Sequence, residues 1–203
     1  MIIYDIGSSV LHWTQNASNV WKNSTIYPFD GMTEMKLFYD EYNSRHNMNY
    51  KYNIGVLCDE DYKRISFYQN DELSGGNSYY KEIGHKDSHT IFTENHIKHK
   101  IGIKLETVVR NKNIPMPDLI KIDVQGAELD ILKGSMSVIN HAKFLIVELQ
   151  HTAYNKGAPL CNQTRDFLIE NGWQVYAEKF CNNGPDADWC FVNTNYHATH
   201  VLH

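Results

Sequence analysis

Strand-like and helix-like stretches alternate along this chain. The clearest case is residues 119–124, an apolar run that follows a proline, which is the pattern of a strand buried on both faces of a parallel sheet. From residue 129 to 139 apolar residues recur at helical spacing with charged residues between them, so a helix follows this strand after Gly126. Further short apolar runs predict strands at 2–6, 24–31, 52–57, 64–68, 144–149, 173–177 and 189–192.

This order of elements predicts a doubly wound α/β fold with a mostly parallel sheet. The last two runs, 173–177 and 189–192, predict an antiparallel C-terminal hairpin at the edge of that sheet. Pro28 removes a backbone donor from the second strand, which is therefore expected to pair imperfectly. The stretch 70–99 is polar, and so long a loop in a small domain is usually functional.

Composition and charge narrow the class of protein. A length of 203 residues suits one domain with a substantial core, so we predict a single domain over 1–203. The chain starts directly on a strand, which leaves open that the domain is cut from, or fused to, a longer protein. A formal net charge of −5 without a basic stripe argues against a nucleic-acid partner. A small-molecule or glycan substrate is the expected partner.

The cysteines and the hydropathy pattern predict the compartment. Cys58, Cys161, Cys181 and Cys190 show no CxxC spacing, so we expect reduced thiols and neither disulfides nor a zinc site. No apolar run approaches the roughly 18 residues of a membrane span, and no leader precedes the first strand. We therefore expect a soluble cytoplasmic protein without a membrane partner.

Acidic residues follow several of the predicted strands at or near their carboxyl ends. Asp30 ends the second strand, Asp123 lies at the end of 119–124, and Glu148 ends 144–149. Open α/β sheets bind their ligands in the crevice at these strand ends. Asp30, an acid some 25 residues after Asp5, is placed to accept both hydroxyls of a ribose, although it or Thr33 could instead start the following helix.

The stretch around Asp123 also carries a family resemblance. Residues 118–134 read D-L-I-K-I-D-V-Q-G-A-E-L-D-I-L-K-G, which resembles the signature of the FkbM family of S-adenosylmethionine (SAM) dependent methyltransferases. That signature usually reads I-K-I-D-V-E-G, so Gln125 replaces a glutamate. Further family-like stretches are Y-D-I-G at 4–7, F-D-G at 29–31, G-G-N-S at 75–78 and F-L-I-V-E-L at 144–149.

The resemblance implies a class I, Rossmann-like methyltransferase fold with SAM as cofactor. The first motif departs from the family pattern, because Ser9 and Leu11 replace an asparagine and a glycine. Members often methylate hydroxyls of sugars, deoxyhexoses such as rhamnose among them, which implies an O-methyltransferase acting on a glycan or glycosylated metabolite. We assign cofactor binding to Asp5, Gly7, Ser8, Asp30, Gly31, Leu57, Cys58 and Asp59, and substrate binding to Asn77, Ser78, Gln125 and Glu128.

Asp123, Glu148 and His151 are our candidate catalytic residues. A sugar hydroxyl is a poor nucleophile while protonated, so either one of the three accepts its proton or the trio binds a divalent cation, Mg²⁺ or Mn²⁺, that lowers its pKa. We favour the base because two carboxylates are few for a magnesium site. A purely structural alternative has Glu128 capping its helix and Glu148 paired with Lys121.

Two other classes of function compete with a methyltransferase. A nicotinamide-dependent oxidoreductase should carry G-x-G-x-x-G after the first strand, and residues 7–12, G-S-S-V-L-H, lack it. A glycan-binding or scaffolding domain that has lost SAM is compatible with the altered first motif. A methyltransferase with an acceptor other than a sugar also remains an alternative.

Overall fold

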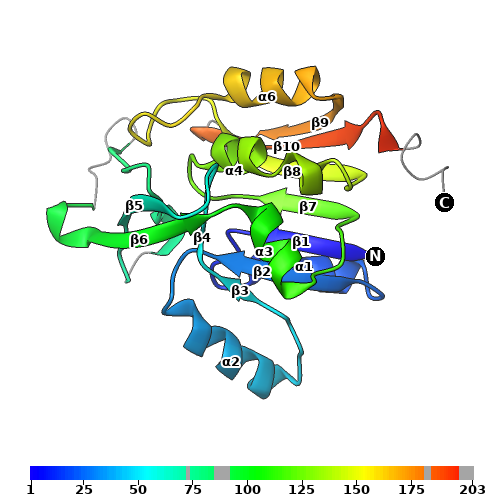
Figure 1. Ribbon diagram of the computed structural model, residues 1–203, viewed down its shortest axis with the longest axis horizontal. Coiled ribbons are helices and arrows are strands. Elements are labelled where there is room, and N and C mark those ends of the chain that lie inside the picture. The colour runs from blue at the N-terminus through cyan, green and yellow to red at the C-terminus, as the bar shows by residue number, and fades with distance from the viewer. Residues whose placement is uncertain (72–73, 85–91, 181–183, 197–203) are drawn as a thin grey trace.

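A central seven-stranded sheet organises the described part of the chain, residues 1–71, 74–84, 92–180 and 184–196 of the computed structural model (Figure 1). The strands lie in the order β3-β2-β1-β7-β8-β10-β9. All neighbours from β3 to β8 are parallel, whereas β10 is antiparallel to both β8 and β9. The predicted doubly wound α/β fold is therefore confirmed.

The strands of this sheet and of a smaller one have the following bounds. They are β1 (Ile2–Ile6), β2 (Thr25–Asp30), β3 (Asn53–Ile54), β4 (Val56–Leu57), β5 (Lys63–Tyr68), β6 (Ile97–Ile103), β7 (Leu119–Ile122), β8 (Phe144–Gln150), β9 (Trp173–Phe180) and β10 (Asp186–Asn193). The helices are α1 (His12–Val20), α2 (Met35–His46), α3 (Leu105–Lys112), α4 (Glu128–Gly134), α5 (Met136–Ile139) and α6 (Cys161–Glu170), with short 3₁₀ turns η1 (Ser74–Gly76) and η2 (Glu94–His96).

Two apolar clusters cover the two faces of the sheet. One contains residues of α3, α4, α5 and α6, among them Leu105, Leu132 and Leu168, each fully buried. The other contains residues of α1 and α2 together with the small sheet, such as Tyr39 and Phe67. Every residue of β7 is buried, as expected of a strand covered on both faces. In Figure 1, α6 lies beside the β9 end of the sheet and α2 beside the β3 end.

The predicted third strand is divided between two sheets. Asn53 and Ile54 pair with the end of β2, but Gly55 has a φ of 155° and turns the chain away. Val56 and Leu57 then pair with β6 in a three-stranded sheet of order β4-β6-β5. The prediction of one continuous strand over 52–57 was wrong because it ignored the left-handed or extended freedom of the central glycine.

The predicted helix after β7 is also divided. It ends at Gly134, where an added Cβ would lie 2.7 Å from the Cα of Asp59. A short second helix, α5, then starts after Ser135. Because the 58–59 turn approaches Gly134 so closely, the chain there is fixed by tertiary packing, which the helical spacing of the sequence did not reveal.

The predicted antiparallel C-terminal hairpin is present at the edge of the sheet. β10 inserts between β8 and β9, so the earlier strand, β9, forms the edge of the sheet. Among the described cysteines, Cys58, Cys161 and Cys190 form no disulfide, and Cys181 lies outside the described residues. None of the described helices is long and apolar enough to span a membrane.

Candidate functional site

A cavity opens at the carboxyl ends of β1, β2 and β7. It encloses about 810 Å³ of empty space, open solvent at its mouth included. β2 and β3 follow β1 on one side of it, whereas β7 and β8 lie on its other side. The cavity therefore lies at the point where the order of the strands reverses, the switch point at which open α/β sheets bind ligands. The lining comprises Ile6, Gly7, Ser9, Phe29, Asp30, Gly31, Met32, Gly55, Val56, Leu57, Phe67, Gly75, Asn77, Ser78, Tyr79, Asp123, Val124, Gln125, Ala127 and Ile131.

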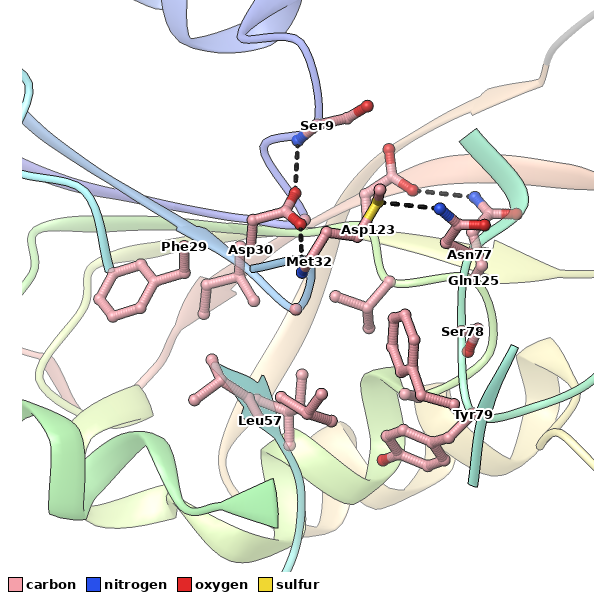
Figure 2. Close-up of a pocket in the computed structure, with 18 of the residues that line it drawn as sticks. Ser9, Phe29, Asp30, Met32, Leu57, Asn77, Ser78, Tyr79, Asp123 and Gln125 are labelled. Atoms are coloured by element: carbon pink, nitrogen blue, oxygen red, sulfur yellow. Dashed lines mark hydrogen bonds between the residues drawn. The ribbon is translucent and has the colours of Figure 1, made fainter. Parts of the chain in front are cut away.

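Asp30 is the acid at one end of the cavity (Figure 2). Its Oδ2 accepts the Ser9 backbone N–H at 2.9 Å, and its Oδ1 accepts the Met32 N–H at 2.8 Å. Burial raises its pKa, although these hydrogen bonds act in the opposite direction. The Tyr39 hydroxyl also donates to Oδ2, at 3.4 Å. Each carboxylate oxygen has two acceptor positions, so Oδ1 can accept a further hydrogen bond. Asp30 does not start α2, whose N-terminal flanking residue is Glu34.

Gly7 makes the tight turn after β1 possible. Its φ is 85°, and an added Cβ would lie 1.7 Å from the Asp123 carbonyl oxygen. The backbone N–H of Asp123 in turn donates to the Ile6 carbonyl at 2.9 Å. Only glycine therefore allows the loops after β1 and β7 to meet at the cavity.

Asp123 lies at another part of the same lining, and its carboxylate oxygens accept hydrogen bonds from Lys121 and Gln125. Lys121 Nζ donates to its Oδ2 at 2.7 Å and Gln125 Nε2 to its Oδ1 at 3.0 Å. The same Gln125 nitrogen donates to Glu148 Oε2 at 2.7 Å. The structure thus brings Asp123, Gln125 and Glu148 together (Figure 2 shows the first two).

The two carboxyl groups, of Asp123 and Glu148, differ in their pKa and therefore in their charge. Burial alone would raise the pKa of Asp123, but the ammonium of Lys121 and hydrogen bonds from Lys121, Glu148 and Gln125 outweigh it and hold the pKa below its ordinary value. Burial and the neighbouring Asp123 charge raise the pKa of Glu148 well above its ordinary range. At neutral pH Asp123 is therefore ionised and Glu148 carries a proton.

Glu128 holds the turn between β7 and α4. Gln125 and Gly126 have φ values of 56° and 101°, so two successive residues are left-handed. The Glu128 Oε1 accepts the backbone N–H groups of Val124 at 2.9 Å and Gly126 at 3.1 Å. Its carboxylate thus braces the backbone of the turn and does not line the cavity, where we had assigned it to substrate.

Asp5 is buried beneath the β1 turn. It faces Lys121 in register across β1 and β7, and its Oδ2 accepts the hydroxyl of Thr14. Burial raises its pKa to about 6, against the lowering effect of Lys121. Asp5 lies outside the lining and can act on a ligand only through its neighbours.

Other residues assigned to the cofactor also lie behind the lining. The Ser8 hydroxyl contacts Phe29 O and the Tyr39 hydroxyl, at 3.1 and 2.8 Å. Cys58 and Asp59 come directly after β4 of the small sheet, and Asp59 forms an ion pair with Lys63 at 2.6 Å. Gly7, Asp30, Gly31, Leu57, Asn77, Ser78, Asp123 and Gln125 do line the cavity.

The structure separates His151 from Asp123 and Glu148. The His151 backbone N–H donates to the Pro185 carbonyl at 2.7 Å, which continues the pairing of β8 with β10. Side chains alternate between the faces of a strand, so residues 148 and 151 point to opposite faces. The His151 ring lies 6.1 Å from the Trp189 ring, beside a recess that also contains Arg165. Our grouping of His151 with the two carboxylates is therefore corrected.

The alternative role of this trio as ligands of a cation has no geometric support. Within the described ranges, no three His, Cys, Asp or Glu side chains are grouped so as to hold a metal ion. The Asp123 carboxylate already accepts from the Lys121 ammonium through Oδ2 and from Gln125 through Oδ1. A divalent cation is consequently not part of the site that we derive.

A cover segment, residues 74–84, closes one side of the cavity. Tyr79 and Tyr80 both donate to Asp130 Oδ2 of α4, at 3.0 and 2.9 Å. Asn77 Nδ2 lies 2.8 Å from Met32 Sδ, and Ser78 pairs with Tyr68 through both backbone groups (Figure 2 shows the Asn77 contact). The segment is thus fixed to both walls of the site.

Sequence reasoning missed most of the apolar wall. Phe29, Val56, Phe67 and Ile131 line the cavity beside Asp30, and Tyr79 lines it from the cover segment. Phe29 precedes an acid that we did assign, so its position was accessible from the sequence. Phe67 comes from the small sheet and Ile131 from a helix, and only their tertiary placement brings them here.

Comparison with known proteins identifies the family. Residues 6–175 match the Methyltransferase FkbM domain, so the chain belongs to this family. A hexuronic acid methyltransferase, AglP, of Haloferax volcanii is 33% identical over 67 residues, which are 33% of this chain and 28% of that protein.

Solved structures of methyltransferases share the fold. TrmK of M. capricolum, in complex with S-adenosyl-homocysteine, aligns with a TM-score of 0.53 at 15% identity, over 96% of this chain and 62% of that one. Sp1610 of Streptococcus pneumoniae, in complex with SAM, aligns at 0.50 and 11% identity, over 94% and 65%. The chain thus spans less than two thirds of each of these proteins. At such identities the likeness shows a class I, Rossmann-like fold alone.

Proposed function

We propose that this protein is a SAM-dependent O-methyltransferase that transfers a methyl group to a hydroxyl of a sugar. The observation that carries the proposal is a single cavity lined by a buried acid, Asp30, and by a lysine-held carboxylate, Asp123. The first acid suits the ribose of a nucleoside cofactor, and the second suits an acceptor hydroxyl. Membership of the FkbM methyltransferase family supports the reaction class.

The residues near Asp30 fit a nucleoside. Its Oδ1 retains acceptor capacity beyond the Met32 contact and can accept one ribose hydroxyl, whereas Oδ2 already accepts from Ser9 and, at 3.4 Å, from Tyr39. The apolar residues Val56, Leu57 and Phe67 provide a wall for a purine ring. Gly55 and Gly75 line the cavity with no atom within 4 Å of an added Cβ, so side chains at these positions would enter open space. SAM bound here supplies the methyl group.

The residues near Asp123 fit an acceptor hydroxyl. When the new carbon–oxygen bond forms and the carbon–sulfur bond breaks, the hydroxyl proton must leave the acceptor oxygen, and the ionised Asp123 carboxylate is positioned to accept it. Lys121 and Gln125 hold that carboxylate in one orientation. The enzyme's main contribution is then to position the acceptor oxygen about 3 Å from the methyl carbon.

A sugar is the acceptor class with the most support. The lining combines carboxylate, amide and hydroxyl groups, which bind polyols through hydrogen bonds. The name of the relative from Haloferax volcanii, a hexuronic acid methyltransferase, points the same way over the 67 matched residues. The members of the family that the sequence resembles often methylate sugar hydroxyls.

The proposal is tested by incubating the protein with isotopically labelled SAM and a panel of glycosides, followed by mass spectrometry. We expect label on a sugar hydroxyl, and strongly reduced labelling when Asp123→Asn replaces the parent. Transfer to protein or RNA, but to no glycoside, would refute the sugar acceptor. Binding of SAM without transfer to any acceptor class would instead favour a binding domain.

A further inference from the structure

The amide of Gln125 makes an unusual pair of contacts. Its Nε2 donates to Asp123 Oδ1 and to Glu148 Oε2, at 3.0 and 2.7 Å. An amide nitrogen carries two hydrogens, so one is used for each carboxyl group. We infer that Gln125 is a positioning residue that fixes Asp123 relative to Glu148 for the acceptor hydroxyl. This inference rests on the proposed function and adds a role that the family signature, with its more usual glutamate, does not contain.

The turn itself does not require a glutamine side chain. The backbone N–H groups of Val124 and Gly126 are satisfied by Glu128, and the left-handed φ of 56° at Gln125 is one that glycine or asparagine adopts more easily. A side chain kept at such a position is a reason to look for a function. Here the Gln125 amide donates hydrogen bonds to the carboxyl groups of Asp123 and Glu148.

The contacts of Gln125 constrain the orientation of Asp123. Lys121 donates to one oxygen of the carboxylate and Gln125 to the other, so the plane of the carboxylate is set from both sides. The Gln125 nitrogen faces the ionised Asp123 carboxylate because the amide oxygen cannot donate a hydrogen bond to it. Small misplacements of a reacting group reduce rates strongly, so this fixed orientation matters for the reaction.

The charge balance explains why an amide is favoured over an acid here. Lys121 is the ammonium in hydrogen-bond contact with Asp123, and its side chain is 6% exposed. The surroundings of Lys121 and Asp123 are already rich in acids. Lys121 interacts electrostatically with Asp5 and Glu148, and Glu148 interacts with Glu128, Asp186 and the Tyr154 hydroxyl. A glutamate at position 125 would add a further carboxyl group and could donate at most one hydrogen bond, and only when protonated.

The matched variants are Gln125→Leu, Gln125→Glu and Gln150→Leu. Gln150 is a control because it is a buried amide on the same strand as Glu148, with its Nε2 bonded to Asn155 Oδ1 at 2.8 Å.

We expect Gln125→Leu to lower kcat roughly 10- to 100-fold and to leave the Kd for SAM within about twofold. In Gln125→Glu, the rising limb of the pH–rate profile should move to higher pH, because the added acid favours protonated Asp123. Gln150→Leu should lower the melting temperature without moving that limb.

A second readout does not depend on turnover. In ¹³C NMR titrations of the protein without ligands, the Asp123 carboxyl should titrate at higher pH in Gln125→Leu than in the parent, because a hydrogen bond to its charged form is lost. Parent-like kcat and an unchanged Asp123 titration in Gln125→Leu would overturn the inference. Failure of the parent to methylate any glycoside, with the Asp123 titration shifted as expected, would refute the sugar acceptor and retain the positioning role.

Discussion

Replacing Glu128 with glutamine should make the stability of this protein less dependent on pH. Glu128 is 5% exposed and supports the turn through hydrogen bonds from Val124 and Gly126. Burial raises its pKa from 4.5 to about 7. The folded protein therefore keeps this proton over a range of pH in which the unfolded chain has already lost it.

The size and sign of the effect follow from these two pKa values. Between pH 4.5 and about 7 the folded state binds more protons at Glu128 than the unfolded state, so the free energy of unfolding falls as pH rises through this window. Between pH 6 and pH 8 the loss amounts to about 1 kcal/mol. Glutamine keeps an acceptor oxygen for the two N–H groups but does not titrate, so this loss should disappear.

Urea unfolding at pH 6 and pH 8 measures the effect. We expect the parent to lose about 1 kcal/mol more stability between these pH values than Glu128→Gln does. Glu41→Gln is the control, since the Glu41 side chain is 63% exposed on α2 and its replacement should leave the pH dependence parallel to that of the parent. Parallel curves for the parent and Glu128→Gln would refute the argument.

Three further predictions concern the cavity. Gly7→Ala should destabilise the protein by about 2 to 5 kcal/mol in urea unfolding, because its Cβ would meet the Asp123 carbonyl oxygen and its φ is left-handed. Asp123→Asn should lower kcat by about 10² to 10⁴ with little change in the Kd for SAM, whereas His151→Ala, on the Trp189 side of the strand, should retain parent-like kcat. Activity should persist after dialysis against EDTA, because Lys121 already neutralises Asp123; loss with EDTA and recovery with Mn²⁺ would contradict this.

The sequence was most informative where one residue has one physical role. The acid at the end of β2 and the glycine after β1 could be placed in the site because parallel strands deliver their carboxyl ends to one crevice. Asp30 and Gly7 both line the cavity. The mostly parallel sheet likewise follows from the alternation of elements along the chain.

The sequence was least informative about the direction in which a side chain points, because closeness along the chain does not determine it. His151 is three residues beyond Glu148, but an odd separation along a strand changes the face, and the ring contacts Trp189. Glu128 is an acid within the family signature, but its carboxylate accepts hydrogen bonds from the backbone of the turn and does not reach the cavity. The Tyr79 contact with Asp130 joins residues 51 apart, which no local pattern could have indicated.

Titration calorimetry with SAM tests the central claim most directly, namely that Asp30 holds the cofactor in this cavity. We predict that the parent binds SAM and that Asp30→Ala weakens binding by about 1.5 to 3 kcal/mol, through loss of charged hydrogen bonds. Asp40→Ala is the control, since Asp40 lies on the exposed face of α2 and accepts from Lys36 and Tyr52. Equal affinity for SAM in the parent and Asp30→Ala would contradict the account.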